Sequence, residues 1–132
     1  LVYPCSHKPA YGTAKPPADS NDSSKDPLAQ KIIKHWCPLF DKYQVTAVFE
    51  NDHHTYKRTH PLLNNQIDRK RGIVYLGDGC WGVDTRAVPK PGELWYLAKA
   101  ESKRHLISVT IRDGKPEYVA YEADGKVIDQ HS

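Results

Sequence analysis

Two charged side chains at the start of successive predicted strands carry the most specific chemistry in this sequence. Glu93 opens the segment 93–97, and Arg104 opens the segment 104–111. Cleavage of an RNA phosphodiester needs a general base, a general acid and a cation that stabilises the charge developing on the phosphate. A carboxylate such as that of Glu93 can act as the base, and a guanidinium such as that of Arg104 can act as the cation. His105 is a candidate acid, but neighbouring strand residues point to opposite faces, which favours a surface or satisfied polar position for it.

These residues depend on a three-stranded antiparallel meander, predicted over residues 93–97, 104–111 and 117–122. Asp113-Gly114 and Asp124-Gly125 are typical of tight hairpin turns, because glycine accepts a positive φ. Alternation along the second strand predicts that one set of side chains faces the core, namely Ile107, Val109 and Ile111.

A helix is predicted to begin at Asp26-Pro27. Asp26 can cap the free N–H groups of a first turn, and Pro27 suits the first helical position. Apolar residues then recur every four positions, which indicates one buried stripe, and Pro38 is expected to bend or end the helix; the stripe comprises Leu28, Ile32, Trp36 and Phe40. With strands at 44–49 and 73–76, this order predicts an α+β fold in which one N-terminal helix packs on a twisted antiparallel sheet.

The chain is long enough for a single domain, residues 1–132, with its helix-plus-sheet core in residues 28–128. Residues 6–26 are rich in proline and polar residues and are predicted to form a flexible arm or surface loop. Residues 50–72 are predicted to be a long polar loop. A net charge of +3 favours anionic partners only mildly, and no apolar run approaches the roughly 20 residues of a membrane span.

The first residue and the cysteines favour a secreted protein. The sequence starts at Leu1 and has no methionine, which suggests that a secretory signal has been removed. Three cysteines fit one disulfide and one thiol, with Cys5 joined to either Cys37 or Cys80, although three reduced thiols in the cytosol fit equally well.

Two other groups of polar residues are candidate binding sites. His53, His54 and His60 lie near Asp52, but adjacent histidines rarely bind one ion and no i, i+4 spacing is present, so no metal site is predicted. An RNA interface is a second possibility, because basic side chains can follow a phosphate backbone while aromatic rings stack on bases. Its candidates are Tyr56, Lys57, Arg58, Arg69, Lys70, Arg71 and Trp81. The plain alternative is a solvated charged loop.

The order of an N-terminal cysteine, one helix and an antiparallel sheet, with Glu93 and Arg104 on successive strands, resembles the microbial ribonuclease fold of T1-type and barnase-type enzymes. The segment Tyr3-Pro4-Cys5 further resembles the start of the RNase-like secreted effectors of powdery mildew fungi. Two features depart from these families. Glu122 stands where the catalytic histidine is expected, and no cysteine lies near the C-terminus to pair with Cys5.

The resemblance therefore implies a fungal virulence protein that keeps a ribonuclease-like frame without turnover. Such a protein would be a secreted monomer that can be delivered into host cells, binds a host protein or RNA and needs no cofactor. Two alternatives stay open. One is an active secreted endoribonuclease in which Glu93, Arg104 and a loop histidine converge. The other is an unrelated cystatin-like or NTF2-like protein that binds a partner in a concave sheet face.

Overall fold

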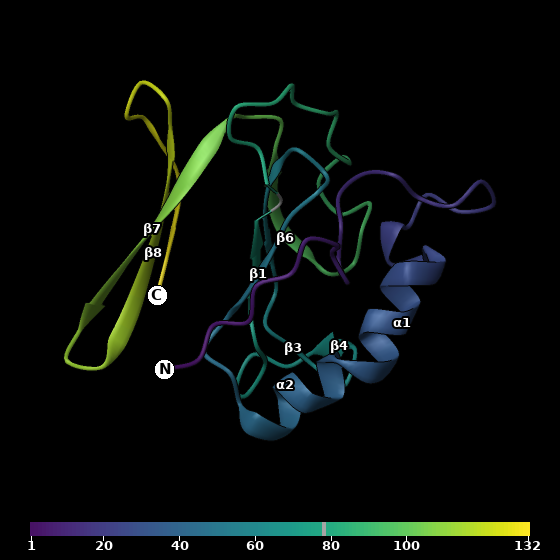
Figure 1. The fold of residues 1–132 in the computed structure, drawn as a ribbon, viewed down its shortest axis with the longest axis horizontal. Coiled ribbons are helices and arrows are strands. Elements are labelled where there is room, and N and C mark those ends of the chain that lie inside the picture. Colours follow the sequence, from purple (N-terminus) through teal and green to yellow (C-terminus); the bar gives the residue numbers. More distant parts are fainter. Residues whose placement is uncertain (78) are drawn as a thin grey trace.

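The computed structural model describes residues 1–77 and 79–132, and the elements of these residues form three layers (Figure 1). Helices lie on one side of a central sheet, and a smaller sheet lies on the other side. This mixture of helices and sheets confirms the predicted α+β class. The elements are η1 (Ser23–Lys25), α1 (Pro27–His35), α2 (Cys37–Tyr43), β1 (Val48–Glu50), β2 (Tyr56–Thr59), β3 (Leu62–Leu63), β4 (Gln66–Ile67), β5 (Tyr75–Gly77), β6 (Leu97–Glu101), β7 (His105–Arg112), β8 (Lys115–Glu122) and β9 (Val127–His131).

The central sheet has the strand order β1-β5-β2-β6 and is mixed, not antiparallel as predicted. Strands β1 and β5 are parallel, whereas β2 is antiparallel to both β5 and β6. The N-terminal segment runs beside β1 in the same direction, because the Phe49 N–H donates to Pro4 O at 2.9 Å and the Ser6 N–H donates to Phe49 O at 2.9 Å. Three chain segments thus run parallel at this side of the sheet.

The predicted helix start is confirmed. The Asp26 carboxylate accepts hydrogen bonds from Leu28 N at 2.9 Å and Ala29 N at 3.3 Å, and Pro27 occupies the first turn. Of the two effects expected of Pro38, the structure shows the end of the helix: α1 ends at His35, and a second short helix, α2, begins at Cys37 with Pro38 in its first turn. Only part of the predicted stripe is buried, since Leu28 and Trp36 remain 43% and 59% exposed.

Alternation along β1 and β5 fills two apolar layers, one on each face of the central sheet. Val48 and Tyr75 belong to the layer that also contains Ile32, Ile33 and Phe40 of the helices, together with Tyr11, Leu62 and Tyr96. Leu76 belongs to the opposite layer, with Ala47, Val74 and Tyr118 of β8. Successive strand residues point to opposite faces, so these short strands can serve both layers.

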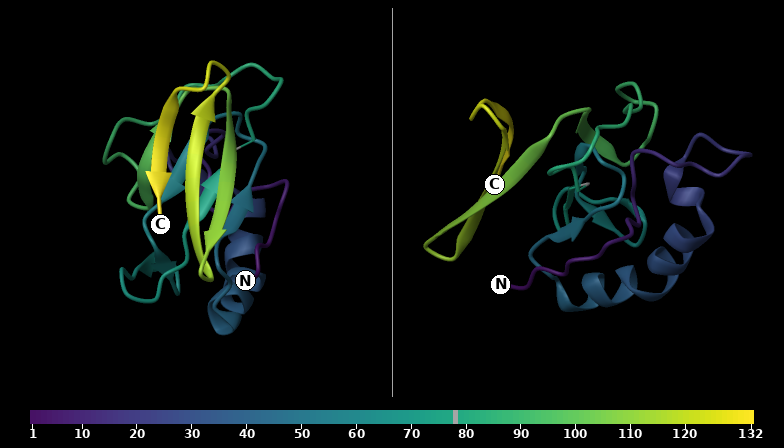
Figure 2. Two further views of the ribbon diagram at one scale, coloured as in Figure 1. Left: turned by 90° about the vertical axis from the view of Figure 1, so that its left-hand side faces the viewer. Right: turned by 45° about the horizontal axis from the view of Figure 1, so that its top comes forward.

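The smaller sheet is an antiparallel meander of β7, β8 and β9 (Figure 2). The strands predicted at 104–111 and 117–122 are confirmed, with the turn at Asp113-Gly114. The first predicted strand, 93–97, is wrong: turns continue to Tyr96, and β6 then pairs with β2 in the central sheet. Val109 and Ile111 are 37% and 52% exposed, because this end of the hairpin extends beyond the core, so of the predicted inward set only Ile107 packs against it.

Two segments predicted as loops contribute to the folded interior. Residues 6–26 contain little regular structure, yet Ala10 and Tyr11 are 0% and 1% exposed, so a flexible arm is the wrong description of that part. Residues 50–72 include β2, β3 and β4. Among the described residues, no helix is both long and apolar enough to cross a bilayer.

Candidate functional site at the carboxyl edge of the parallel strands

The structure does not assemble the predicted ribonuclease residues on neighbouring strands. Glu93 lies in an exposed turn, where its Oε2 atom accepts a hydrogen bond from Lys90 N at 2.9 Å. Arg104 precedes β7 and donates to Val83 O at 2.8 Å and to Asp84 Oδ1 at 2.9 Å. The segment that contains Glu93 leads into the central sheet and Arg104 leads into the meander, so the predicted pairing of acid and cation across adjacent strands is wrong.

His105 is a buried polar side chain. It is 5% exposed, its Nδ1 atom lies 3.2 Å from Lys103 O, and its ring packs edge-on against Tyr56. Burial lowers the pKa of His105, and the hydrogen bond to Lys103 only partly offsets this effect.

The predicted RNA-contacting residues fall into two groups. Tyr56 and Lys57 are 2% and 0% exposed, and Arg58 is held by Asp129 through Nε at 2.7 Å. These three side chains are buried or half-buried because both faces of β2 are covered: Lys57 pairs with Glu50 on one face, and Tyr56 and Arg58 both hydrogen-bond to Asp129 of β9 on the other. Arg69, Lys70, Arg71 and Trp81 are exposed, as a nucleic-acid contact requires.

All three cysteines, Cys5, Cys37 and Cys80, have free thiols, so the structure supplies no pairing for the predicted disulfide. Cys5 is exposed, and Cys37 and Cys80 are buried. Burial raises the pKa of Cys37 to about 12, which makes this thiol unreactive near neutral pH.

A different group of side chains gathers where the parallel segments end. The N-terminal segment leads into His7 and Lys8, and β1 leads into Asp52, His53 and His54. The carboxyl ends of adjacent parallel strands meet at one edge of a sheet, and ligands of α/β proteins commonly bind in the crevice there. The candidate site is therefore this edge.

A buried ion pair fixes the segment that carries His7 and Lys8. Lys57 Nζ contacts Glu50 Oε2 and also donates to Tyr11 O, and both charged side chains are at most 1% exposed. Glu50 additionally accepts hydrogen bonds from Ala10 N at 2.7 Å and Tyr11 N at 3.4 Å. The two strands thus hold the backbone of residues 10–11 in place through fully paired charges.

Asp52 is the centre of the site. Its Oδ2 atom accepts hydrogen bonds from Lys8 Nζ at 2.6 Å and from Lys15 Nζ at 3.0 Å, and its Oδ1 atom lies 3.6 Å from His7 Nε2. Burial by itself raises the pKa of Asp52, but the hydrogen bonds from Lys8 and Lys15 outweigh it and hold this pKa well below its usual range. The carboxylate is consequently ionised at any pH near neutrality.

The two histidines after Asp52 have different surroundings. The Nδ1 atom of His53 accepts hydrogen bonds from Thr13 N at 3.1 Å and Ala14 N at 3.0 Å. Burial, reinforced by the charge of Lys57, lowers the pKa of His53 to about 4, so the ring is neutral at pH 7. His54 is half-buried, and its Nδ1 atom lies 3.2 Å from Asp84 O. His53 therefore accepts hydrogen bonds that hold the backbone of residues 13–14, whereas His54 remains partly exposed to solvent.

The loop itself is held in an unusual backbone conformation. Asp52 and His54 have φ values of 83° and 59°, which cost non-glycine residues free energy. Arg86 braces the loop, since its Nη1 atom donates to Asp52 O at 2.7 Å and its backbone N–H donates to His54 O at 3.1 Å. Gly12 is needed beside His53, because a Cβ atom there would lie 2.3 Å from the imidazole ring.

Two donors of this site suit a transition-metal ion. An imidazole nitrogen and a carboxylate oxygen bound to one zinc-like ion, each at about 2.0–2.1 Å, would lie roughly 3.4 Å apart at a tetrahedral angle. The 3.6 Å between His7 Nε2 and Asp52 Oδ1 is close to that separation. Within residues 1–77 and 79–132, no group of three or more His, Cys, Asp or Glu side chains is placed to hold a metal. His7 and Asp52 could thus supply two ligands but not a complete set.

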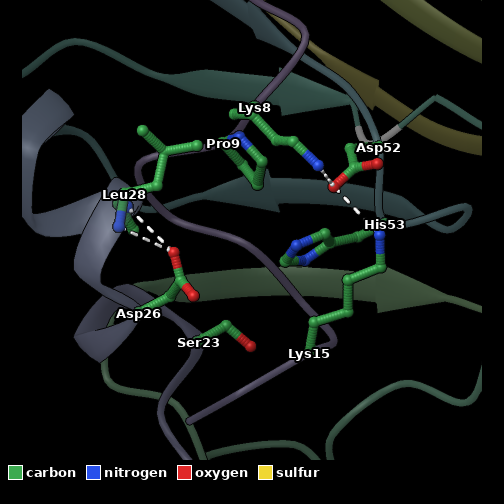
Figure 3. A pocket seen from close by; sticks show the side chains of 9 residues that line it. Lys8, Pro9, Lys15, Ser23, Asp26, Leu28, Asp52 and His53 are labelled. Carbon is green, nitrogen blue, oxygen red and sulfur yellow. Dashed lines mark hydrogen bonds and ion pairs between the residues drawn. The ribbon is translucent and has the colours of Figure 1, made fainter.

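A pocket of about 200 Å³ adjoins Asp52 on the side of α1. Figure 3 shows Lys8, Asp52, His53 and Lys15 on one side of it and Leu28, Asp26 and Ser23 on the other. Pro9 and Ala29 complete the lining.

The sequence indicated Asp52, His53 and His54 as candidate polar residues, but it did not indicate that His7, Lys8 and Lys15 belong to the same site. His60, grouped with the histidines by proximity in sequence, lies after β2 and is not part of the site. No local motif joins residue 7 to residue 52. The signal that would have found the pair is the parallel pairing of Cys5 with Phe49, which is not visible in the sequence pattern.

Comparisons with known proteins connect this fold to a phosphatase. No family model matches the chain. The structure superimposes over 97% of its length on 24% of purple acid phosphatase PPD1 from yellow lupin (Lupinus luteus) seeds, with a TM-score of 0.76 and 18% sequence identity. At this identity the likeness shows the fold alone: the chain has the fold of one part of that phosphatase.

Two relatives are similar in sequence. They are uncharacterized proteins from two strains of Mycobacterium tuberculosis, CDC 1551 / Oshkosh and H37Rv, and each is 33% identical over 110 residues, covering 68% of this chain. The chain spans about a fifth of their length, since the match covers 19% of each.

Proposed function

We propose that this chain forms part of a phosphatase and contributes one wall of a site that binds and hydrolyses phosphate esters. The observation that carries the proposal is the arrangement around Asp52, where His7 approaches one carboxylate oxygen and Lys8 and Lys15 contact the other. The fold shared with a part of a purple acid phosphatase supports it.

The lysines are suited to bind the phosphate. Each ammonium group has three N–H donors, and Lys8 and Lys15 each direct only one hydrogen bond to Asp52. Two cations share one carboxylate, so a net positive charge remains at the site. The free donors of Lys8 and Lys15 would contact the non-bridging oxygens and stabilise the charge that develops during transfer of the phosphoryl group.

His7 and Asp52 would supply two ligands of a catalytic metal ion. His7 and Asp52 would hold the ion, which would supply an activated water as the nucleophile near neutral pH. Asp52 is suited to this role because its low pKa keeps it in the anionic form that metals bind. His7 is exposed and has no other hydrogen-bond partner among the described residues, so its ring is free to ligate.

The test is hydrolysis of p-nitrophenyl phosphate by the protein that carries these residues, assayed with added divalent or trivalent transition metals. Asp52→Asn and His7→Ala should each lower kcat/KM by about 100-fold or more, an effect at the scale of removing a group that stabilises the transition state. His35→Ala, which removes an exposed histidine of α1, is the matched control and should retain full activity. Full activity in His7→Ala would refute the metal-ligand role, and absence of both hydrolysis and phosphate binding would refute the function.

The ribonuclease-like hypothesis, including its finer fold assignment and secretion, stays a separate prediction. The exposed basic turn of Arg69, Lys70 and Arg71 is the feature that favours RNA contact. Replacing these three residues by glutamate should weaken binding of a single-stranded RNA oligonucleotide, measured by fluorescence anisotropy, and should reduce its salt dependence. An unchanged affinity would remove this turn from the hypothesis.

A further inference from the structure

The pocket beside Asp52 has opposite charge at its two sides (Figure 3). On one side, Lys8 and Lys15 outnumber the single carboxylate of Asp52. On the other side stands the carboxylate of Asp26, at the start of α1. This polarity limits which ligand can occupy the pocket favourably.

Only part of Asp26 is used by the helix. Its Oδ1 atom accepts both hydrogen bonds from the first turn, whereas its Oδ2 atom receives none from the described residues. Asp26 is half-buried, so this oxygen lies in a partly desolvated position where a cation would be bound more strongly than at the open surface.

Ser23 adds an unsatisfied group to the same side. Its side chain is 2% exposed, and its Oγ atom has no hydrogen-bond partner in the part of the chain that the structure describes. A buried hydroxyl without a partner costs free energy, and a hydrogen-bonding ligand group would remove that cost. Ser23 lines the pocket next to Asp26.

Between the charged sides, the lining is apolar. Pro9 and Ala29 are buried, and Leu28 closes the pocket beside them. A ligand that suits the whole pocket therefore has an anionic group at one end, a cationic donor at the other and a short hydrocarbon linker between them.

We propose that this pocket binds the alcohol part of a zwitterionic phosphate monoester, a short aminoalkyl phosphate. The phosphate contacts Lys8 and Lys15, the methylene groups lie against Pro9 and Ala29, and the ammonium group contacts Asp26 Oδ2 near Ser23. This substrate class rests on the proposed phosphatase function and makes Asp26 a specificity-determining residue for it.

The experiment compares phosphoethanolamine with ethyl phosphate, which has a similar shape but no amine, by isothermal titration calorimetry. Phosphoethanolamine should bind about tenfold more tightly, as expected for a hydrogen bond between charged groups. Asp26→Asn should abolish this preference and leave the affinity for ethyl phosphate unchanged. Asparagine is as good a helix N-cap as aspartate, so α1 should persist, which circular dichroism checks.

Asp113→Asn is the matched control, because it removes one carboxylate at the distant β7–β8 turn and should keep the preference. Equal binding of the two ligands by the unmodified protein would overturn the inference while leaving the phosphatase proposal intact. A preference that survives in Asp26→Asn would overturn it as well. Failure of both ligands to bind would refute the phosphate site itself and the inference with it.

Discussion

Lys57 and Glu50 form an ion pair in the interior of the protein, with side chains that are 0% and 1% exposed. The pair joins β1 to β2 and also holds the backbone of Tyr11, because Lys57 donates to Tyr11 O and Glu50 accepts from Tyr11 N. The residues that bring His7 and Lys8 to Asp52 thus depend on a buried charge network that reaches from β1 across β5 to β2.

Lys57→Met should destabilise the protein by about 3–5 kcal/mol, because it leaves the Glu50 carboxylate buried without its cation. The measurement is the free energy of unfolding from urea titration. Lys115→Met, an exposed lysine replaced in the same way, should change it by less than about 0.5 kcal/mol. A small effect of Lys57→Met would show that Glu50 becomes protonated or solvated at little cost.

The helix start and the hairpin turn could be predicted from the sequence. The contacts between residues that are far apart in the chain could not, for physical reasons. Asp26-Pro27 and Asp113-Gly114 act through adjacent backbone groups, so the helix start and the hairpin turn follow from neighbouring residues alone. Residues 50–72 were predicted to form a polar loop because they include charged residues such as Glu50 and Lys57. No local pattern shows that these two opposite charges form an ion pair in the protein interior.

The site depends still more on distant pairing. Lys8 and Asp52 are 44 residues apart and meet because the N-terminal segment runs parallel to β1. Parallel pairing has no turn between its partners and therefore no turn signature. Glu93 illustrates the opposite error, since its position near the start of an apolar segment suggested a strand that instead begins at Leu97.

His53 should make stability depend on pH. Its pKa in the folded protein is lowered to about 4, below the value near 6.5 expected for an unfolded chain. The unfolded state therefore binds more protons between these values, so the stabilisation is complete above about pH 6.5 and is lost as the pH falls through about 4.

His53→Gln isolates this contribution, because the glutamine carbonyl can accept hydrogen bonds but does not titrate. Urea unfolding at pH 7.5 and pH 5 should show a smaller loss of stability in the variant than in the unmodified protein. Other buried histidines, such as His105, titrate in both proteins and cancel in the comparison. An equal loss in both would contradict the assignment, and His35→Gln should behave like the unmodified protein.

Gly12→Ala should disturb the site through sterics alone. The added Cβ atom would lie 2.3 Å from the His53 ring, which must then move away from Thr13 N and Ala14 N. Overpacking of this kind typically costs about 1–3 kcal/mol. In the double variant Gly12→Ala with His53→Ala the clash is absent. Its loss of unfolding free energy should therefore be smaller than the sum of the losses in the two single variants. If the losses of unfolding free energy are strictly additive, the His53 ring and Gly12 are not in contact in solution.

Lys15→Met tests the cationic side of the site without adding a hydrogen-bond donor. Lys15 Nζ lies 3.0 Å from Asp52 and is 43% exposed, so its charge acts partly through solvent. Removing it should weaken binding of inorganic phosphate about tenfold at low ionic strength, and by less at high ionic strength, where exposed charges are screened. Lys115→Met should leave the affinity unchanged.

A double variant tests whether the two lysines share the role of neutralising Asp52. In Lys15→Met, Asp52 repels phosphate more strongly because one lysine fewer neutralises it. Adding Asp52→Asn should therefore recover part of the lost affinity. If the double variant binds no better than Lys15→Met alone, the two lysines do not act as a shared counter-charge.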